Sequence, residues 1–375
     1  MALTKYTLGE LLVRNSETNE ELKYAAASVR GVLNSKGISG TKVDIDGRDL
    51  RKFLVVKPGG FVFNHRVHDK LGLGHNTSNE TYLFTNDYVA FYVRPEVENN
   101  VLLPDYLYMW FLRPEFDRYM LFKTYGSATL FFNWDNMCEL EIKLPDIAVQ
   151  QKYVDIYKSM VANQQSYERG LEDLKLTCDG YIEDLRRKMP CEKIGKYLEL
   201  VEQKNDHLQY GLDAVRGIAT NKRLIPTKAN MNGVSLVTYK IVGPGQIAYV
   251  PDTSRRGNKI SIAFNDTQES FLVSSISIVF RTKTEYLLPE YLALFFARVE
   301  FDRYARFNSW GSARETFDWE EMCNVQIPIP DIKVQRAIAD IYAVYQTRKR
   351  INEQLKAQIK NICPILIRGS LEDGG

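Results

Sequence analysis

The amino-acid sequence contains a long internal repeat, and this repeat is the feature that most constrains how the chain folds. A displacement of 185 residues carries Gly126–Ala128 onto Gly311–Ala313, and the same displacement carries Phe116–Tyr119 onto Phe301–Tyr304. Roughly half of the positions from Gly126 to Tyr157 recur identically in the second copy. The chain is therefore expected to contain two copies of one scaffold.

The two halves differ most near the beginning of each. Val29–Gly31 matches Val215–Gly217 after one further residue of displacement, but residues 34–86 share little with residues 220–266. A duplicated scaffold that diverges in one region is what two recognition domains for different targets would show. Neutral drift of solvent-exposed loops is the alternative explanation.

Composition favours a cytoplasmic protein with two domains. A chain of 375 residues is too long for one ordinary domain, and its apolar content of 45% is that of a globular protein. The five cysteines are scattered without a C-x-x-C pair, which indicates reduced thiols rather than disulfides or a zinc site. Because the sequence shows no signal peptide and no apolar run of about 18 residues, no membrane segment is expected. The net charge of +2 neither requires nor excludes nucleic acid.

Each half is expected to begin with a compact α+β domain. Short β-rich runs alternate with turns that contain Pro-Gly or Asn/Asp. A helix should start after Leu103-Pro104 and after Leu288-Pro289, since proline suits the first turn of a helix. The expected strands are Phe53–Val56, Phe61–Phe63, Tyr82–Phe84, Val89–Val93, Ser235–Ile241, Ile247–Val250, Lys259–Phe264 and Ser275–Arg281.

One tryptophan and one cysteine near the end of each domain are expected in the core. Trp134 and Trp319 precede apolar strands, and Cys138 and Cys323 follow a methionine at the entry to the same strands. Burial in the core is the simplest role for all four side chains.

Each half ends with a long helix. Pro145-Asp146 and Pro330-Asp331 are start signals, because proline ends the preceding strand and aspartate caps the new helix. The helices are expected over residues 146–188 and 331–368, and residues 369–375 are interpreted as a disordered tail.

Apolar residues recur four and three positions apart along both helices, which is the pattern of a coiled-coil seam. Polar residues interrupt the seam at its middle in both copies. If the helices pair antiparallel about a pseudo-twofold axis, Gln164 and Glu168 meet Arg348 and Asn352 in a central layer that sets register. The alternative is that these side chains reach solvent from parallel or unpaired helices. The apolar seam residues are Val154, Tyr157, Val161, Leu171, Cys178, Ile182, Leu185, Val334, Ile338, Ile341, Tyr345, Leu355, Ile359 and Ile362.

One block of motifs occurs twice, at Gly126–Gln151 and at Gly311–Arg336. It contains Gly-Ser, an aromatic residue, Ile-x-Leu/Ile-Pro-Asp-Ile-x-Val-Gln and the start of a long helix. Over nearly the whole chain this order resembles the specificity subunits of type I restriction–modification systems. The resemblance implies an α+β fold in which two target-recognition domains, residues 1–145 and 189–330, are joined by two long antiparallel helices. The helices would act as a pseudo-twofold, coiled-coil spacer.

The resemblance also implies a function and partners. Each domain would read one half of a bipartite site in double-stranded DNA, and the helices would dock two modification (methyltransferase) subunits, with restriction/translocase subunits as optional partners. S-adenosylmethionine, ATP and Mg²⁺ would belong to those partners, so no cofactor is expected for this chain. There are two alternatives. The chain could be the specificity subunit of a type II system with a fused methylase–nuclease, or a stand-alone two-headed DNA-binding protein.

Basic residues gather in the regions where the two halves diverge. Local basic surface on a nearly neutral chain is typical of phosphate binding, and Arg or Asn side chains in loops suit guanine and adenine edges. A solvated surface charge is the alternative for any one residue. The DNA-binding candidates are Arg30, Lys36, Lys42, Arg48, Arg51, Lys52, Asn64, His65, Arg66 and Lys70 in the first half, and Arg216, Lys222, Arg223, Lys228, Arg255, Arg256 and Lys259 in the second.

A second candidate region is the loop before the strand that leads into each long helix. These loops combine small residues, hydroxyls, an aromatic residue and basic residues, and by the resemblance they face DNA. A structural turn that needs glycine at positive φ is the alternative. The residues concerned are Lys123, Tyr125 and Ser127 in the first half, and Asn308, Trp310, Ser312 and Arg314 in the second.

No motif for catalysis is present. The sequence lacks the Asn/Asp-Pro-Pro-Tyr/Phe motif of an adenine methyltransferase and the G-x-x-x-x-G-K-S/T phosphate loop. His65, His68 and His75 have no nearby cysteine, which favours a polar loop over a metal site. The chain is therefore expected to have no catalytic or metal site of its own, and an unrecognised enzymatic site is the remaining alternative.

Overall fold

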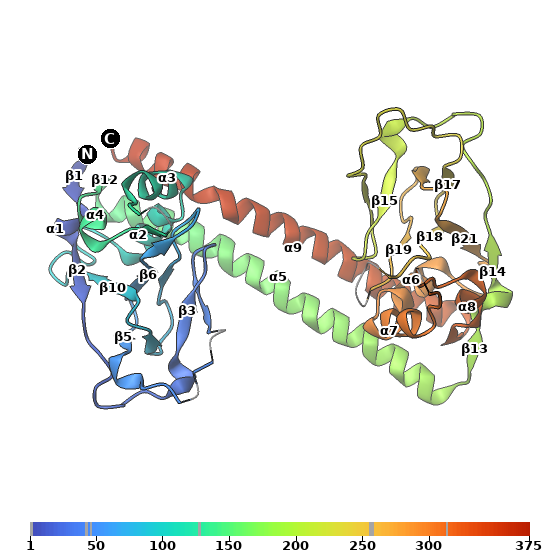
Figure 1. The fold of residues 1–375 in the computed structure, drawn as a ribbon, viewed down its shortest axis with the longest axis horizontal. Helices are drawn as coiled ribbons and strands as arrows, with labels where there is room; N and C mark the ends of the chain where they lie inside the picture. The colour runs from blue at the N-terminus through green and yellow to red at the C-terminus, as the bar shows by residue number, and fades with distance from the viewer. Residues whose placement is uncertain (1–2, 42–43, 46, 127–128, 255–258, 313) are drawn as a thin grey trace. The chain divides into compact units, whose positions relative to one another are not determined.

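The computed structural model describes residues 3–41, 44–45, 47–126, 129–254, 259–312 and 314–375, which form two compact units. Unit 1 contains Met1–Ser166 and Asn352–Gly375, and unit 2 contains Tyr167–Ile351. Figure 1 shows that each unit combines a set of short strands with short helices and with parts of two long helices, α5 (Ile147–Lys188) and α9 (Ile332–Asp373).

Most elements recur in the same order in the two units; η2, β7 and β11 have no counterpart among the described residues of unit 2. Those of unit 1 are β1 (Thr4–Thr7), α1 (Leu8–Leu11), β2 (Leu12–Asn15), η1 (Ala26–Ser28), β3 (Arg30–Val32), β4 (Ile38–Gly40), η2 (Leu50–Lys52), β5 (Leu54–Val56), β6 (Phe61–Asn64), β7 (Arg66–Val67), β8 (Leu73–His75), β9 (Tyr82–Phe84), β10 (Tyr88–Val93), α2 (Pro104–Phe111), α3 (Pro114–Lys123), β11 (Leu130–Phe131), α4 (Trp134–Cys138) and β12 (Glu141–Leu144). Those of unit 2 are β13 (Cys191–Lys193), η3 (Ile194–Tyr197), β14 (Leu198–Leu200), η4 (Leu212–Ala214), β15 (Arg216–Ile218), β16 (Leu224–Pro226), β17 (Lys240–Val242), β18 (Ile247–Tyr249), β19 (Ile262–Phe264), β20 (Phe271–Val273), β21 (Ile278–Thr282), α6 (Pro289–Phe296), α7 (Val299–Phe307), α8 (Trp319–Asn324) and β22 (Gln326–Pro328).

A four-stranded antiparallel sheet forms the centre of each unit. Its order is β2-β10-β6-β8 in unit 1 and β14-β21-β18-β19 in unit 2, so the repeat extends to strand topology. Aromatic rings fill the space between sheet and helices. In unit 1 the ring centroids of Phe61 and Phe91 lie 5.1 Å apart, and Phe91 meets Phe111 of α2 edge-on at 6.3 Å. Burying each such ring stabilises the fold by roughly 2–3 kcal/mol.

The α+β fold class and most of the expected elements are confirmed. Helices α2 and α6 begin at Pro104 and Pro289, and β6, β9, β10, β18 and β21 lie at the short β-rich runs that predicted them, although β21 begins only at Ile278. The expected strand Ser235–Ile241 is corrected to β17, because residues 235–239 form turns and loop that end in a Tyr239-to-Leu236 bond.

A short antiparallel pair precedes each long helix. Strand β12 pairs with β1, and β22 pairs with β13, so the start of each repeat lies beside the strand that leads into the helix. A Cβ at Gly9 would lie 3.1 Å from Cβ of Cys138, and one at Gly195 would lie 2.7 Å from Cβ of Cys323. Close backbone approach therefore requires glycine at both equivalent positions.

The segments around Trp134 and Trp319 differ from expectation. Each tryptophan begins a short helix, because Asn133 and Asp318 accept hydrogen bonds from main-chain N–H groups three residues later. Both tryptophans pack against core phenylalanines. The two cysteines that follow, Cys138 and Cys323, are half-buried at the ends of these helices rather than fully buried.

A buried glutamine joins the start of α5 to the rest of unit 1. Gln150 is 0% exposed; its Oε1 accepts a hydrogen bond from the N–H of Leu103 at 3.0 Å. Its Nε2 donates to the carbonyl oxygens of Val101 at 2.8 Å and Pro145 at 2.9 Å. One side chain thus satisfies main-chain groups of the loop before α2 and of the strand–helix junction.

Unit 2 contains the same arrangement. Gln335 is 0% exposed, accepts from the N–H of Leu288 at 2.9 Å, and donates to the carbonyl oxygens of Tyr286 and Pro330, each at 2.8 Å. Asp146 and Asp331 cap the two long helices as predicted. Oδ1 of Asp146 accepts the N–H of Val149, and Oδ1 of Asp331 accepts those of Lys333 and Val334.

The long helices pack antiparallel within each unit. In unit 1, Val154 near the start of α5 shares a core cluster with Cys363 and Ile367 near the end of α9. In unit 2, Ile182 near the end of α5 shares a cluster with Ile338 near the start of α9. Val334, an expected seam residue, is 37% exposed instead.

The polar interruption of the seam is partly visible in each unit. In unit 1, Gln164 and Asn352 are both buried, and Nε2 of Gln164 donates to Oδ1 of Asn352 at 2.9 Å. In unit 2, the guanidinium of Arg348 lies 5.9 Å from the ring centroid of Tyr167 and against Gly170. That these residues and Glu168 set the register of the helix pair stays a prediction.

The end of the chain is helical, which corrects the expected disordered tail over residues 369–375. Helix α9 continues to Asp373 because its last turns pack on unit 1: Ile367 is buried in the core, and the hydroxyl of Ser370 lies 2.7 Å from that of Tyr106. Asp373 accepts hydrogen bonds from Lys152 at 2.7 Å and from the Tyr153 hydroxyl at 2.9 Å. In the described part of the chain, no helix combines the length and apolar composition of a membrane span.

His75 is a buried ionisable group in the core of unit 1. Its ring stacks on Phe61 with centroids 4.2 Å apart, and neither ring nitrogen has a hydrogen-bond partner. Asp105 lies 3.8 Å away, but burial dominates and lowers the pKa of His75 to about 4. Unit 2 has Phe264 at the equivalent end of its strand, since both residues pair with the first residue of the central strand.

We expect Gln150→Met to lower the free energy of unfolding of unit 1 by about 2–4 kcal/mol, because three buried main-chain groups lose their partner. Urea denaturation measures this change, and hydrogen exchange at the Leu103 amide reports the lost bond directly. Gln151→Met is the matched control, since the exposed Gln151 bonds its neighbour Asp155 and its loss should cost less than about 0.5 kcal/mol. Equal effects of the two variants would contradict the assigned role.

We expect unit 1 to lose stability on acidification through His75. The unfolded chain, with a pKa near 6.5, binds a proton more readily than the folded chain, with a pKa of about 4. The free energy of unfolding therefore falls as the pH decreases through this window, by up to about 3 kcal/mol. His75→Phe, which copies unit 2, should abolish this contribution. Urea midpoints at several pH values measure it, and an unchanged slope in the variant would disprove it.

Candidate nucleic-acid interface

Three loops meet at one end of unit 1. The tip of the β3–β4 hairpin contacts the segment around β8, because the N–H of Gly37 donates to the carbonyl oxygen of Leu73 at 2.7 Å. That segment also holds β7, which pairs with β11 in the register Arg66↔Phe131. We define the described residues among 33–37, 64–73 and 124–131 as the loop surface of unit 1.

The loop before β11 is a closed hairpin. The N–H and C=O groups of Tyr125 and Phe131 bond to each other at 3.2 and 2.8 Å, and the N–H of Phe132 donates to the carbonyl oxygen of His65 at 2.9 Å. The ring of His65 stacks on Phe131 with centroids 5.5 Å apart. Two separately predicted candidate regions, Asn64–Arg66 and the Tyr125 loop, are therefore adjacent.

Unit 2 brings the corresponding segments together by the same main-chain contacts. Trp310 and Thr316 close the equivalent hairpin with bonds of 3.1 and 2.9 Å. The N–H of Thr253 donates to the carbonyl oxygen of Glu315 at 3.0 Å, which joins this hairpin to the loop that follows β18. We define the described residues among 219–223, 251–262 and 309–316 as the loop surface of unit 2.

Glycine is required in both hairpins. Gly126 has φ +116° and Gly311 has φ +138°, and a Cβ at either would lie 2.1 Å from the carbonyl oxygen of Thr129 or Arg314. The need for glycine at positive φ in a structural turn thus explains Gly126 and Gly311. It leaves the neighbouring aromatic residues unexplained, since Tyr125 is 55% and Trp310 is 62% exposed.

A buried ion pair attaches the β3–β4 hairpin to helix α3. Nζ of Lys36 lies 2.6 Å from Oδ1 of Asp117, and the lysine side chain is 4% exposed. In unit 2, Lys222 of the β15–β16 hairpin pairs with Asp302 of α7, which also accepts the N–H of Ile260 at 3.1 Å. Burial lowers the pKa of both lysines, while the carboxylates act in the opposite direction.

These pairs give a structural role to two of the predicted DNA contacts, whose contact with DNA stays a prediction. Lys36 and Lys222 have left-handed backbones, with φ 63° and 67°, which turn each hairpin so that its lysine points inward. Each ammonium group is paired with a carboxylate of its own unit, so each lysine holds its hairpin against a short helix. The positive φ costs about 1 kcal/mol per residue, and the buried pair offsets it.

Arg30 and Arg216 also have structural partners. Nη1 of Arg30 donates to the carbonyl oxygens of Ala27 and Val29, and the guanidinium lies 4.6 Å from the centroid of the Tyr82 ring. Arg216 makes the equivalent bonds and lies 4.4 Å from the Phe271 centroid. Both remain half-buried, so their charge reaches the surface only in part.

Two exposed phenylalanines flank the loop surfaces, and sequence reasoning missed them. Phe122 at the end of α3 is 84% exposed, and Phe307 at the end of α7 is 78% exposed. The 185-residue displacement relates the two phenylalanines, and this repeat was the sequence signal that could have identified them. Each unit therefore places two exposed aromatic residues beside its hairpin.

The remaining candidates are distributed as follows. On or beside the loop surfaces, Arg66 is 58% exposed with Asp87 at 3.8 Å, and Lys123 pairs with Glu139 at 2.9 Å. Asn308 caps α7 through the Tyr304 carbonyl oxygen, and Arg223 is half-buried. The exposed candidates are Lys70, Lys228, Lys259, Ser312 and Arg314. Lys42, Ser127, Arg255 and Arg256 lie outside the described residues.

A second basic group in unit 1 is remote from the loop surface. Arg48, Arg51 and Lys52 are exposed on and before η2, which immediately precedes β5. Figure 1 shows β5 and the loops before it at the end of unit 1 away from α3. The structure therefore divides the first-half candidates between two ends of the unit. No cluster of three His, Cys, Asp or Glu side chains suited to a metal ion occurs among the described residues.

We expect Lys36→Met to act on stability rather than on charge at the surface. It leaves the carboxylate of Asp117 buried without its partner, which should lower the free energy of unfolding of unit 1 by about 3 kcal/mol. The matched control is Lys70→Met, where an exposed charge is lost and the change should stay below about 0.5 kcal/mol. Urea denaturation of both variants decides between the roles, and a stable Lys36→Met protein would restore Lys36 as a contact candidate.

Comparison with known proteins finds a family model that matches part of the chain and solved structures with a similar fold. Residues 252–361 match the family model for the type I restriction modification DNA specificity domain. Among solved structures, the crystal structure of the type I restriction–modification system S subunit from M. genitalium has a TM-score of 0.58 at 11% identity, covering 99% of this chain and 96% of that chain. No curated protein matches the sequence.

Two other solved structures also match but superpose less well. The HsdS subunit from Thermoanaerobacter tengcongensis has a TM-score of 0.42 at 11% identity, with 98% of this chain and 96% of that chain covered. A type I R-M structure solved for complex assembly and conformational transition has a TM-score of 0.43 at 11% identity, with 98% of each chain covered. Residues 252–361 thus resemble the type I restriction modification DNA specificity domain, and the fold of the chain is similar to that of the S subunit from M. genitalium, as the resemblance predicted.

Proposed function

We propose that the chain is the non-catalytic DNA-specificity subunit of a type I restriction–modification complex. In this proposal each unit recognises one half of a bipartite site in double-stranded DNA. The chain also positions two methyltransferase subunits and, where present, restriction/translocase subunits. The reacting cofactors, S-adenosylmethionine, ATP and Mg²⁺, belong to those partners.

The observation that carries the proposal is that one scaffold holds two different loop surfaces. The buried lysine–aspartate pair, the glycine hairpin and the sheet order are the same in both units. The side chains that these constraints present differ, with Asn64–Arg66 in one unit and Val250–Asp252 at the equivalent positions of the other. Constant backbone geometry with variable side chains is what recognition of two different half-sites requires.

The long helices support the positioning role. Several apolar side chains on them face outward, including Ile156 at 40%, Leu176 at 73% and Ile365 at 65% exposed. Exposed apolar side chains at this density on a helix are typical of a surface that another protein covers.

We expect the chain to direct adenine methylation at a split motif when it is produced with the neighbouring methyltransferase in a host without its own methylation. Genome-wide mapping of modified adenines gives the motif. Exchange of residues 205–315 for those of a relative should change one half-site and leave the other, because the exchanged segment holds the loop surface of unit 2 and leaves both long helices intact.

The control is the corresponding exchange of residues 19–130, which should change the opposite half-site. A continuous motif, or a change of both halves by either exchange, would contradict recognition by two separate units. Sequence-specific binding by the isolated chain with no effect on methylation would favour a stand-alone DNA-binding protein.

A further inference from the structure

The short helices α3 and α7 each expose one phenylalanine at their C-terminal end. Phe122 is 84% and Phe307 is 78% exposed, so neither ring belongs to the core of its unit. Helix α3 lies at the end of unit 1 away from β5, and α7 lies at the end of unit 2 away from β17 (Figure 1). A single exposed apolar residue needs no explanation, but the same ring exposed at the same place in both units indicates a surface that another molecule covers.

Each phenylalanine is the last residue of a stripe along the outward face of its helix. Positions four residues apart lie on one face of an α-helix, and on α3 the opposite face is buried through Phe116 and Met120. The exposed positions four apart have the order apolar residue, arginine, phenylalanine in both helices. We define the outer stripes as Pro114, Arg118 and Phe122 of α3 and Val299, Arg303 and Phe307 of α7.

The arginine and the phenylalanine of the stripe recur identically in the two units. The residues on either side of the phenylalanine change instead, from Leu121 and Lys123 in α3 to Arg306 and Asn308 in α7. The loop surfaces, which are the candidates for reading two different half-sites, differ as well. Side chains that recur on exposed positions are therefore expected to contact a molecule that is the same for both units.

The charges around the stripes suit a protein better than DNA. In unit 1, Glu115 lies 3.2 Å from Arg118, and in unit 2, Glu315 pairs with Arg306, the residue before Phe307. Carboxylates repel phosphate groups, and surfaces that bind DNA are much more positively charged than those that bind proteins. Exposed aromatic rings and arginines are enriched at protein–protein interfaces, where they provide most of the binding energy.

We infer that the outer stripes of α3 and α7 dock two copies of one protein subunit. One copy on each unit explains why the stripe recurs while the loop surfaces diverge. Under the proposed function, on which this inference rests, the subunit present in two copies is the methyltransferase. Its matching surface has an apolar pocket for the phenylalanine ring and a carboxylate at the rim of that pocket for the guanidinium of Arg118 or Arg303.

The test titrates the purified full-length chain with the neighbouring methyltransferase in the absence of DNA. Calorimetry gives the affinities, and native mass spectrometry counts the copies bound. We expect two sites on the wild-type chain. Phe122→Ala should weaken one of them by about tenfold or more, Phe307→Ala the other, and the double variant both. Because both rings are exposed, the urea midpoint of each variant should equal that of the wild-type chain.

Two further variants separate docking from a general loss of exposed apolar surface. Tyr286→Ala is the matched control in unit 2, since Tyr286 is 54% exposed but its counterpart in unit 1 is Val101. This variant should retain both sites at wild-type affinity. Arg303→Glu places a negative charge against the expected carboxylate and should weaken only the site on unit 2, whereas Arg303→Lys should retain most of its affinity.

Equal methyltransferase affinities of the wild-type chain and the double phenylalanine variant would overturn the inference. Two other results would overturn it by assigning the stripes to a different occupant. Weaker DNA binding by the double variant with both methyltransferase sites retained would indicate DNA, and loss of self-association would indicate a second copy of this chain. A wild-type chain that binds no methyltransferase would overturn the proposed function as well. Unaltered affinities of the variants, with split-motif methylation intact, would overturn this inference alone.

Discussion

The arrangement of each unit depends on one buried glutamine near the start of its long helix. A helix that leaves a domain has main-chain donors and acceptors around its first turn that lie in apolar surroundings. Gln150 and Gln335 satisfy such groups in the loop before the short helix and at the strand–helix junction at once. Since one rigid side chain bonds to three separate main-chain groups, the direction of the helix is fixed relative to the sheet of the same unit.

The recognition loops are likewise attached to each unit by a few buried contacts. A lysine in a left-handed conformation at a hairpin tip pairs with an aspartate on the short helix, and a glycine closes the neighbouring hairpin. These residues hold the backbone of the loop surface, so the exposed side chains between them can differ without changing the fold. Buried charge and positive φ therefore explain positions that charge counting alone assigned to DNA.

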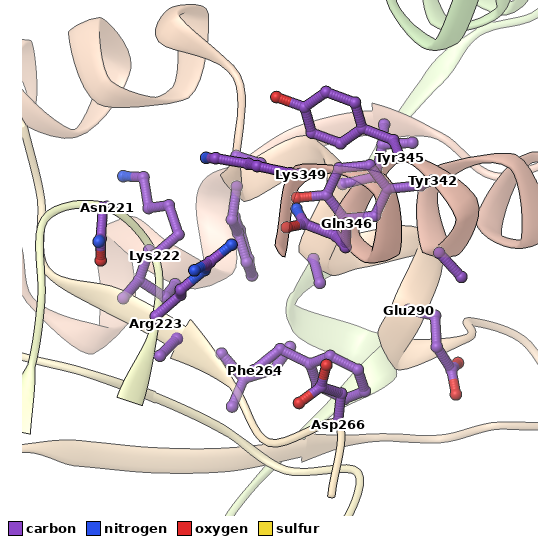
Figure 2. A pocket seen from close by; sticks show the side chains of 18 of the residues that line it. Asn221, Lys222, Arg223, Phe264, Asp266, Glu290, Tyr342, Tyr345, Gln346 and Lys349 are labelled. Atoms are coloured by element: carbon purple, nitrogen blue, oxygen red, sulfur yellow. The ribbon is translucent and has the colours of Figure 1, made fainter. Parts of the chain in front are cut away.

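The two units also differ in how completely they are filled. Tyr108, Lys158 and His75 occupy the junction between sheet and helices in unit 1, whereas Ala293, Ala343 and Phe264 leave a cavity in unit 2. Unit 1 thus contains a buried histidine whose pKa is lowered to about 4, whereas unit 2 contains open space. In unit 2 this space is a cavity of about 730 Å³ (Figure 2).

Much of the architecture was predictable from the sequence, because it depends on local or periodic signals. The repeat displacement, the heptad pattern and the Pro-Asp caps indicated two copies of an α+β domain and two long helices. Proline at Pro104 and Pro289 located the short helices. The chain end was misjudged, because the packing of Ile367 and Ser370 on unit 1 involves residues more than 200 positions away in the sequence.

The sequence by itself determined the duplication, the fold class and the region in which the two copies diverge, since all three are visible in the order of residues. Only the tertiary structure decided which basic residues are available at the surface. Lys36 and Lys70 are both lysines in the same divergent region, but one is enclosed with Asp117 and the other is exposed. The physical reason is that burial and ion pairing depend on partners distant in sequence: Asp117 lies on a helix 81 residues from Lys36.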